Sequence, residues 1–214
     1  MSYIILLNDV DNVFNTEGLL SGNLDCVLTD NGMKQIDSIV NVLDRNYSQQ
    51  LTHIVTSNNS RIVKMLHHIQ IASKFIHSSN TKLWQTNAIR ERDFGYREGG
   101  SYSLKEDMFR VKKIGADSGE TIIECKNRLV THLKKNILLQ ESPINCLLMS
   151  HRFSCQILSN ALLKKKYPIL TDFWINNVSL MVFDIINRKF VFREAYNCSK
   201  DKQQTLDEIY TGIL

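Results

Sequence analysis

Tyr3-Ile4-Ile5-Leu6-Leu7 runs directly into Asn8-Asp9-Val10-Asp11-Asn12. Five consecutive apolar or β-favouring residues are too few for an ordinary helix and are typical of a strand buried on both faces. Open α/β sheets bind ligands at the carboxyl ends of their strands. We therefore expect Asn8 and Asp9, which follow this strand, to face a binding site.

The rest of the chain alternates between helical and strand-like patterns. The expected elements are a helix at 30–45 capped by Thr29, a strand at 53–55, a helix capped by Ser57, a short strand within 74–78, a helix at 122–137 capped by Thr121 and Glu124, a strand at 144–149, a helix at 153–163, and a hairpin of 178–186 with 190–195. The helix at 122–137 has a broad apolar face that includes Ile123. These elements predict an α/β fold, a three-layer sandwich with a mostly parallel central sheet flanked by helices.

Length and composition set the class of protein. The chain has 214 residues, 43% hydrophobic and 22% charged, which is typical of a soluble globular protein. We expect one domain over residues 1–214, with 96–116 as an insertion over the site and 200–214 as a polar tail that forms a loose helix. The net charge of +4 is mild, and its one dense basic run, Lys164 to Lys166, suits a solvated helix end. We therefore expect no nucleic-acid partner.

Cysteine usage and hydropathy indicate the compartment. Five widely spaced cysteines without a Cys-x-x-Cys pair are typical of free thiols in a reducing environment. No signal segment and no run of bilayer-spanning length is evident, so we expect no membrane association. A cytoplasmic location follows, with a nuclear one through a complex. The histidines lack partners at metal-ligand spacing, so we expect no metal site, and nothing in the sequence calls for a cofactor.

Four motifs in order resemble a known family. They are Leu28-Thr29-Asp30-Asn31-Gly32-Met33-Lys34-Gln35, Thr56-Ser57-Asn58-Asn59-Ser60-Arg61, Arg90-Glu91-Arg92-Asp93-Phe94-Gly95, and Ser150-His151 after an apolar strand. This order resembles the histidine phosphatase superfamily, which includes the cofactor-dependent phosphoglycerate mutases. The resemblance covers residues 3–195 and implies a phosphoglycerate mutase-like fold.

The resemblance also implies roles for individual residues. Arg61 stands at the position of a phosphate-binding arginine, Glu91 at that of the general acid, and His151 at that of the second catalytic histidine. The family's Arg-His-Gly, which holds the phosphohistidine nucleophile, is replaced by Asn8-Asp9-Val10. Asn8 therefore stands at a phosphate-binding position and Asp9 at the nucleophile position. Asn15, Arg90 and Arg152 are expected at the pocket edge, with Arg152 in place of a family glycine.

Two hypotheses describe what Asp9 does. A carboxylate about 4 Å from a phosphate opposes its binding by about 4 kcal/mol per unit charge at an effective dielectric of ~20. In the first hypothesis Asp9 forms an ion pair with Arg61 or His151 and closes the pocket. In the second, Asp9 is a replacement nucleophile assisted by Mg²⁺, with Asp11, Glu91 and Asp93 as helpers.

The expected function is that of a pseudophosphatase that binds a protein partner, a second copy of itself, or a small phosphorylated ligand if the pocket is open. The alternative is an active phosphomonoesterase or phosphomutase that uses His151, Glu91 and Arg61 in a rearranged mechanism. Asn8 and Asp9 discriminate between the two, because catalytic groups act as a unit and the loss of a nucleophile removes most of the rate.

Overall fold

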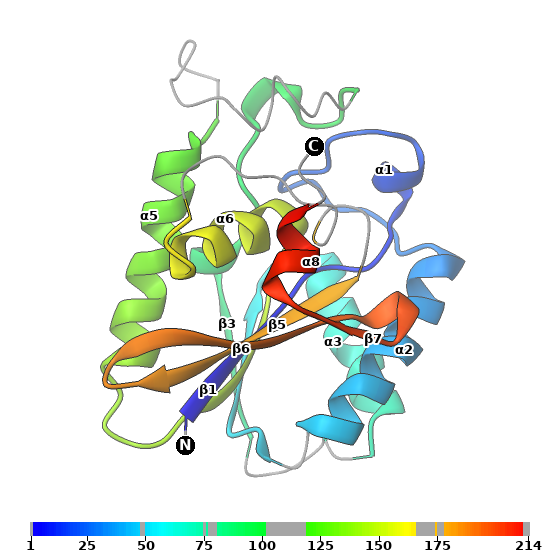
Figure 1. Cartoon of the computed structure of the whole chain (residues 1–214). Coiled ribbons are helices and arrows are strands. Elements are labelled where there is room, and N and C mark those ends of the chain that lie inside the picture. Colours follow the sequence, from blue (N-terminus) through cyan, green and yellow to red (C-terminus); the bar gives the residue numbers. More distant parts are fainter. Residues whose placement is uncertain are drawn as a thin grey trace.

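The computed structural model describes residues 2–47, 50–74, 76, 81–101, 119–165, 174 and 178–211 (Figure 1). Its centre is a seven-stranded mixed sheet in the order β3-β2-β4-β1-β5-β6-β7. The strands are β1 (Ser2–Leu7), β2 (His53–Ser57), β3 (Lys82–Thr86), β4 (Asn145–Met149), β5 (Ser179–Ile186), β6 (Lys189–Asn197) and β7 (Lys202–Gln204). The first four strands run parallel, and β5, β6 and β7 extend the sheet in antiparallel fashion.

Helices cover both faces of this sheet. They are α1 (Val13–Thr16), α2 (Asp30–Asn46), α3 (Ser60–Ala72), α5 (Ile122–Leu133), α6 (Arg152–Leu162) and α8 (Leu206–Thr211), with shorter turns η2 (Asn87–Ile89), η3 (Gly95–Arg97) and η5 (Cys198–Lys200) and the π-helical turn η4 (Lys134–Leu138). Because side chains alternate along a strand, Ile5 packs with α2 and α3 in one core, and Ile4 packs with α5 and α6 in the other. This confirms the predicted α/β class with helices on both faces.

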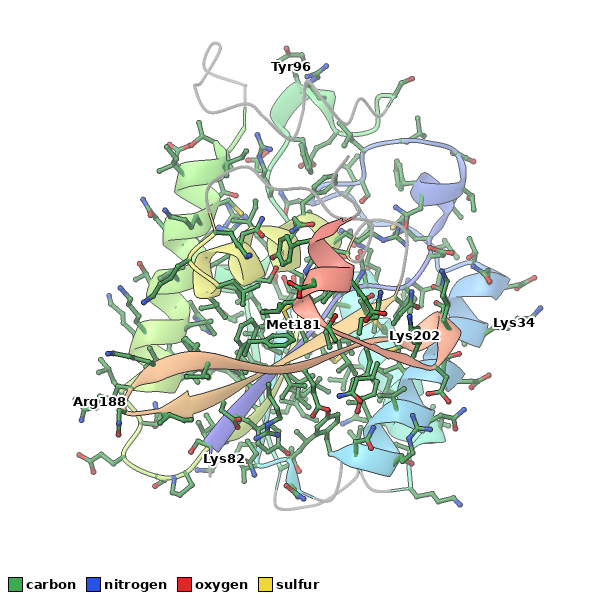
Figure 2. The ribbon with its side chains drawn as sticks, in the orientation of Figure 1. Lys34, Lys82, Tyr96, Met181, Arg188 and Lys202 are labelled. Carbon is green, nitrogen blue, oxygen red and sulfur yellow. The ribbon has the colours of Figure 1, made fainter. Side chains whose placement is uncertain are left out.

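Side chains follow the same division between inside and outside. In Figure 2, Met181 lies among the side chains around the sheet, whereas Lys34, Tyr96 and Arg188 lie at the periphery. Met181 is fully buried, and Tyr96 is exposed. All five cysteines are free, as predicted, and all five are buried. Among the described residues, no helix combines the length and the apolar character that crossing a bilayer needs.

Several predicted boundaries are correct. Thr29 caps α2, its hydroxyl accepting a hydrogen bond from the Gly32 amide at 3.0 Å. Thr121 and Glu124 form the predicted capping box of α5. Asn187 and Arg188 join β5 to β6 with positive φ angles of 50° and 57°, as a tight hairpin turn with a left-handed backbone requires.

Other predictions were wrong. The third strand lies at Lys82–Thr86 and not within 74–78; Ile76 is buried in a turn, and the neighbouring Phe75, His77 and Ser78 lie outside the described residues. Strand β3 was missed because it is an edge strand with exposed side chains, so that it lacks an apolar run.

Two local assignments also need correction. Ser57 ends β2, and the N-cap of α3 is Asn59, whose side chain accepts from the Arg61 amide at 3.2 Å. Ile123 is exposed and not part of the apolar face of α5. The predicted tail does contain a helix, α8, but it is preceded by the unpredicted strand β7. Of the expected insertion at 96–116, residues 102–116 lie outside the described residues.

Candidate functional site

Adjacent strands bring the predicted site residues to one edge of the sheet. Strands β2, β4 and β1 are neighbours, and Leu7 of β1 is in register with Met149 of β4. Asp9 follows β1, His151 follows β4, and Arg61 lies in the first turn of α3, just after β2. Glu91 follows β3 through η2. Residues far apart in the sequence therefore meet at the carboxyl ends of parallel strands, as predicted.

Asp9 and Arg61 form a buried ion pair. Arg61 Nε donates to Asp9 Oδ2 at 3.0 Å. The exposed fraction of the surface is 0% for Arg61 and 4% for Asp9. Burial alone would raise the pKa of Asp9, but His151, Arg61 and Arg152 together hold that pKa below its usual range. Asp9 is therefore an anion at neutral pH, as the ion-pair hypothesis predicted.

Every N–H group of the Arg61 guanidinium has an acceptor inside the protein. Besides Asp9, these acceptors are Leu24 O at 3.0 Å, Asn59 Oδ1 at 3.2 Å, Gly22 O at 2.9 Å and His151 Nδ1 at 2.7 Å. A guanidinium has five donors, and all five are used. Arg61 therefore holds the loop around Gly22 and Leu24 against α3 and offers no free donor to a ligand.

His151 is a neutral imidazole with a defined tautomer. Because Arg61 Nη2 can only donate, His151 Nδ1 accepts, and Nε2 carries the proton that is donated to Ser57 Oγ at 3.0 Å. Nδ1 also lies 3.5 Å from Asp9 Oδ2, but a protonated ring would face Arg61 with like charge. Burial, together with Arg61, lowers the pKa of His151. The ring is fully buried, and its two nitrogens connect Arg61 to Ser57.

Glu91 caps helix α6. Its carboxylate accepts from the Phe153 amide at 3.2 Å and from the Ser154 amide at 2.9 Å, and also contacts the Ser154 hydroxyl at 2.9 Å. The α6 N-cap residue, His151, provides no side-chain cap, so Glu91 supplies it. A carboxylate at a helix N-terminus is stabilised by the free N–H groups and by the helix dipole. Glu91 therefore fastens the start of α6 to the segment that follows η2.

Asn8 connects the end of β1 to the next strand. Its Oδ1 accepts from the Ser179 amide at 2.8 Å, and its Nδ2 donates to Trp174 O at 3.2 Å. The residue is fully buried. Asn8 thus secures the start of β5 and does not reach the pocket described below.

Of the three residues expected at the pocket edge, Arg152 and Asn15 line the pocket and Arg90 does not. Arg152 lines the pocket and forms an ion pair through Nη2 with Asp11. Asn15 also lines it, and its side chain completes a capping box with Asn12 on α1. Arg90 does not: its guanidinium bonds Glu120 at 3.3 Å, outside the lining.

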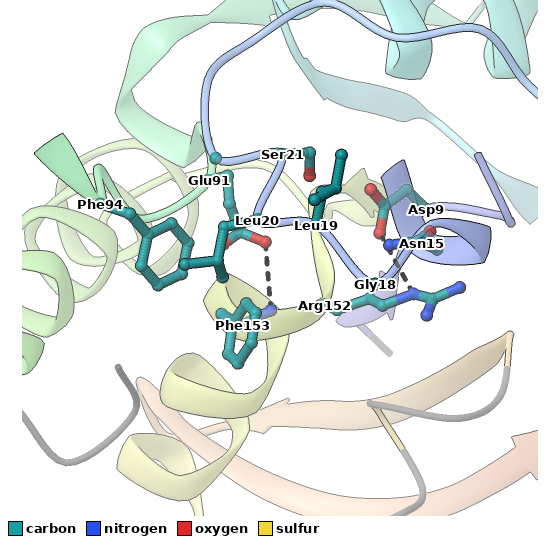
Figure 3. Close-up of a pocket in the computed structure, with 11 residues that line it drawn as sticks. Asp9, Asn15, Gly18, Leu19, Leu20, Ser21, Glu91, Phe94, Arg152 and Phe153 are labelled. Carbon is teal, nitrogen blue, oxygen red and sulfur yellow. Dashed lines mark hydrogen bonds and ion pairs between the residues drawn. The ribbon is translucent and has the colours of Figure 1, made fainter. Parts of the chain in front are cut away.

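A pocket of about 160 Å³ remains at this edge of the sheet (Figure 3). Its lining is Asp9, Asn15, Gly18, Leu19, Leu20, Ser21, Gly22, Glu91, Phe94, Arg152 and Phe153. Figure 3 shows Asp9 and Arg152 on one side, with Glu91, Phe94 and Phe153 on the other. Arg61, expected at a phosphate-binding position, and His151, expected at the position of the second catalytic histidine, are not in the lining. The Asp9 ion pair therefore covers these two groups without filling the whole pocket.

Asp9 keeps one oxygen without a donor. Its Oδ1 is buried and accepts no hydrogen bond from the described residues; the nearest cationic atom recorded is Arg152 Nε, at 3.9 Å. A buried acceptor left unsatisfied costs about 1–3 kcal/mol. This oxygen is therefore an unsatisfied acceptor in the wall of the pocket.

Sequence reasoning missed several residues that complete the site. The most informative are Asn59, which binds Arg61 twice, and Ser57, which binds His151. Asn59 stands two positions before Arg61, a spacing that suits a cap and could have revealed it. The carbonyls of Gly22 and Leu24 carry no side-chain signal. In the described part of the chain, no group of three or more His, Cys, Asp or Glu side chains is arranged to hold a metal ion.

Comparison with known proteins identifies the same family that the motifs indicate. A model of the histidine phosphatase superfamily (branch 1) matches residues 11–198. A 2,3-bisphosphoglycerate-dependent phosphoglycerate mutase from Chlamydia pneumoniae is 26% identical over 169 residues, which are 65% of this chain and 74% of that protein.

Solved structures share the fold. YhfR of Bacillus stearothermophilus superposes with a TM-score of 0.72 at 16% identity, over 90% of this chain and 95% of that one. A mutant phosphoserine phosphatase from Entamoeba histolytica, in complex with phosphoserine, gives a TM-score of 0.64 at 19% identity, over 92% and 98%. At such identities the likeness concerns the fold.

Proposed function

This chain belongs to the histidine phosphatase superfamily, and from that premise we propose that it is a member without phosphatase activity that acts by binding. Its family match begins at residue 11, just beyond Asn8 and Asp9. The family's known members include a mutase and phosphatases, such as the relatives described above. The proposal concerns what this chain does with the same fold.

The observation that carries the proposal is the complete use of Arg61. Its five donors bind Asp9, His151, Asn59 and two loop carbonyls, so that a phosphate would have to displace several of these bonds. The Asp9 carboxylate adds repulsion at the same place, about 4 kcal/mol for each unit of charge at ~4 Å and an effective dielectric of ~20. Phosphate binding and phosphoryl transfer are both disfavoured by this arrangement.

The competing proposal is an active enzyme with a rearranged mechanism. The place of Asp9 in the pocket lining favours the version in which Asp9 is a nucleophile assisted by Mg²⁺. Its proposed Mg²⁺-binding helpers, however, have other partners. Asp11 binds Arg152, Asn31 and Gln35, and Glu91 caps α6. Each would need to leave those contacts to assist a metal ion at Asp9.

The test is hydrolysis of a panel of phosphomonoesters from acidic to neutral pH, with and without Mg²⁺. We expect no turnover above background from the parent protein. The matched variants are His151→Ala and the double variant Asn8→Arg with Asp9→His, which restores the Arg-His pair of the family motif. Turnover by the parent that disappears in His151→Ala would overturn the proposal, whereas a silent parent with an active double variant would support it.

The proposed binding role includes macromolecular partners as well as small ligands. A protein partner or a second copy of this chain would fit a member that has lost catalysis. Size-exclusion chromatography with light scattering would detect self-association over a range of protein concentrations. For a small ligand, the pocket beside Asp9 is the feature that specifies the chemistry.

A further inference from the structure

We propose that the pocket beside Asp9 binds a small organic ammonium ion that carries an apolar group about the size of one aromatic ring. The inference rests on the proposed function, because a pocket that binds phosphate would select the opposite charge. It concerns the ligand class of the same pocket. The support for this ligand class has three parts: the unsatisfied acceptor, the charges in the lining, and the size and walls of the cavity.

The first part is the buried oxygen of Asp9. Oδ2 is held by Arg61, while Oδ1 accepts no hydrogen bond from the described residues. Asp9 lines the pocket, and its side chain is about 95% buried. A ligand that donates a hydrogen bond supplies what this oxygen lacks, and a charged donor bonds a carboxylate more strongly than a neutral one.

The second part is the charge of the lining. It contains two carboxylates, Asp9 and Glu91, against one guanidinium, that of Arg152. Arg152 is ion paired with Asp11 and lies 3.9 Å from Asp9 Oδ1, and Glu91 is bonded to neutral amides at the start of α6. The groups that Glu91 caps on α6 carry no charge, so a ligand ammonium would add a cation beside this carboxylate.

The third part is size and polarity. The pocket volume of about 160 Å³ is close to that of an engineered ~150 Å³ cavity that accepts benzene. Leu19, Leu20, Phe94 and Phe153 form apolar walls, and the rings of Phe94 and Phe153 meet edge to face at 5.2 Å. Figure 3 shows these two rings on the side of the pocket away from Asp9. A ligand with an ammonium at one end and a ring at the other matches that division.

The experiment compares three probes of similar shape on the full chain by calorimetry and thermal unfolding. The probes are 2-phenylethylammonium, 2-phenylethanol and phenyl phosphate. We expect the ammonium to bind at least about tenfold more tightly than the alcohol, since it adds a charged hydrogen bond, and to raise the melting temperature. Phenyl phosphate should neither bind nor be hydrolysed.

Variants locate the binding. Asp9→Asn and Glu91→Gln remove one charge each and should weaken ammonium binding by about tenfold or more. Glu141→Gln removes an exposed charge outside the pocket and serves as the matched control. Ser21→Trp adds bulk to the lining at a half-buried position that is not itself a member of the Asp9–Arg61 pair, so it tests the location even if Asp9→Asn fails to fold.

The outcomes separate the two proposals. Equal affinity for the ammonium and the alcohol, or binding that survives Ser21→Trp, would overturn the ammonium site alone. Tighter binding of phenyl phosphate without hydrolysis would also overturn the ammonium site and leave the non-catalytic role intact. Release of phenol from phenyl phosphate would overturn the proposed function.

Discussion

Asp9 neutralises Arg61 at a place where both side chains are almost fully buried. Removal of one partner of a buried ion pair leaves the other uncompensated, which costs about 3–5 kcal/mol. We therefore expect Asp9→Ala to lower the free energy of unfolding by that amount in urea titrations. Asp9→Asn should cost less, because an amide oxygen can still accept from Arg61 Nε.

The matched control for Asp9→Ala is Asp201→Ala. Asp201 also pairs with an arginine, Arg45, at 2.7 Å, but both side chains are more than half exposed. Solvent screens that pair, so its loss should change the unfolding free energy far less. Equal effects of the two substitutions would show that Asp9 does not compensate a buried charge.

The same network makes stability depend on pH. The pKa values of Asp9 and His151 are both lowered in the folded protein, so the unfolded chain binds more protons as the pH falls. The contribution of His151 is present above its unfolded pKa of about 6.5 and is lost below it; that of Asp9 is lost below about 3.9. We expect the unfolding free energy to decrease from neutral pH downward.

The variant His151→Gln isolates the upper part of that pH dependence. Its unfolding free energy should change less between pH 7.5 and pH 5 than that of the parent, measured by urea unfolding. His132, whose pKa is also lowered by burial, contributes with the same sign and remains in both proteins. An identical pH dependence in parent and variant would exclude a buried neutral His151.

At the scale of elements, Glu91 joins η2 and α6. Loss of its carboxylate in Glu91→Ala removes the acceptor of the Phe153 and Ser154 amides, and loss of a cap costs about 0.5–2 kcal/mol. Hydrogen exchange of these two amides should quicken more than that of the α5 amides. Thr121→Ala, which removes the cap of α5, should show the reverse pattern. Protection of α6 that is unchanged in Glu91→Ala would refute the capping role.

The elements also show what local sequence patterns can predict. Strands β1 and β4 are buried on both faces and could be predicted from their apolar runs alone. Strand β3 lies at the sheet edge, and its Leu83 and Trp84 are exposed, so pairing with β2 and not burial defines it. Ser57 and Asn59 are both good caps by type, and only the geometry at the end of β2 decides between them.

At the scale of the whole molecule, the site could be predicted in position but not in detail. The motifs of Asp9, Arg61 and His151 each follow a predicted strand. Because these strands are parallel neighbours in the sheet, their carboxyl ends bring the three residues together. The saturation of Arg61 could not be predicted, because two of its acceptors are backbone carbonyls of the loop at Gly22 and Leu24. Any sequence could supply such carbonyls, and only the path of the loop brings them within reach.

The balance of charge at this edge leads to a prediction for the whole fold. In the double variant Asn8→Arg with Asp9→His, Arg61 loses its ion-pair partner Asp9 and a further cation is introduced. We expect a lower melting temperature than that of the parent in chloride buffer, and recovery when phosphate is added, because an anion then replaces Asp9. Phosphate at about 100 times its dissociation constant stabilises by about 2.7 kcal/mol.

The parent is the reference for this anion effect. Its melting temperature should not respond to phosphate at matched ionic strength, which separates site binding from general screening. Asp9→His alone serves as a second variant, because Asn8 is fully buried against Ser179 and Trp174 and a larger side chain there disturbs β5. An equal phosphate effect in the parent would mean that Asp9 does not keep anions out. An effect confined to the variants would mean that the carboxylate of Asp9 takes the place of a bound anion in stabilising this fold.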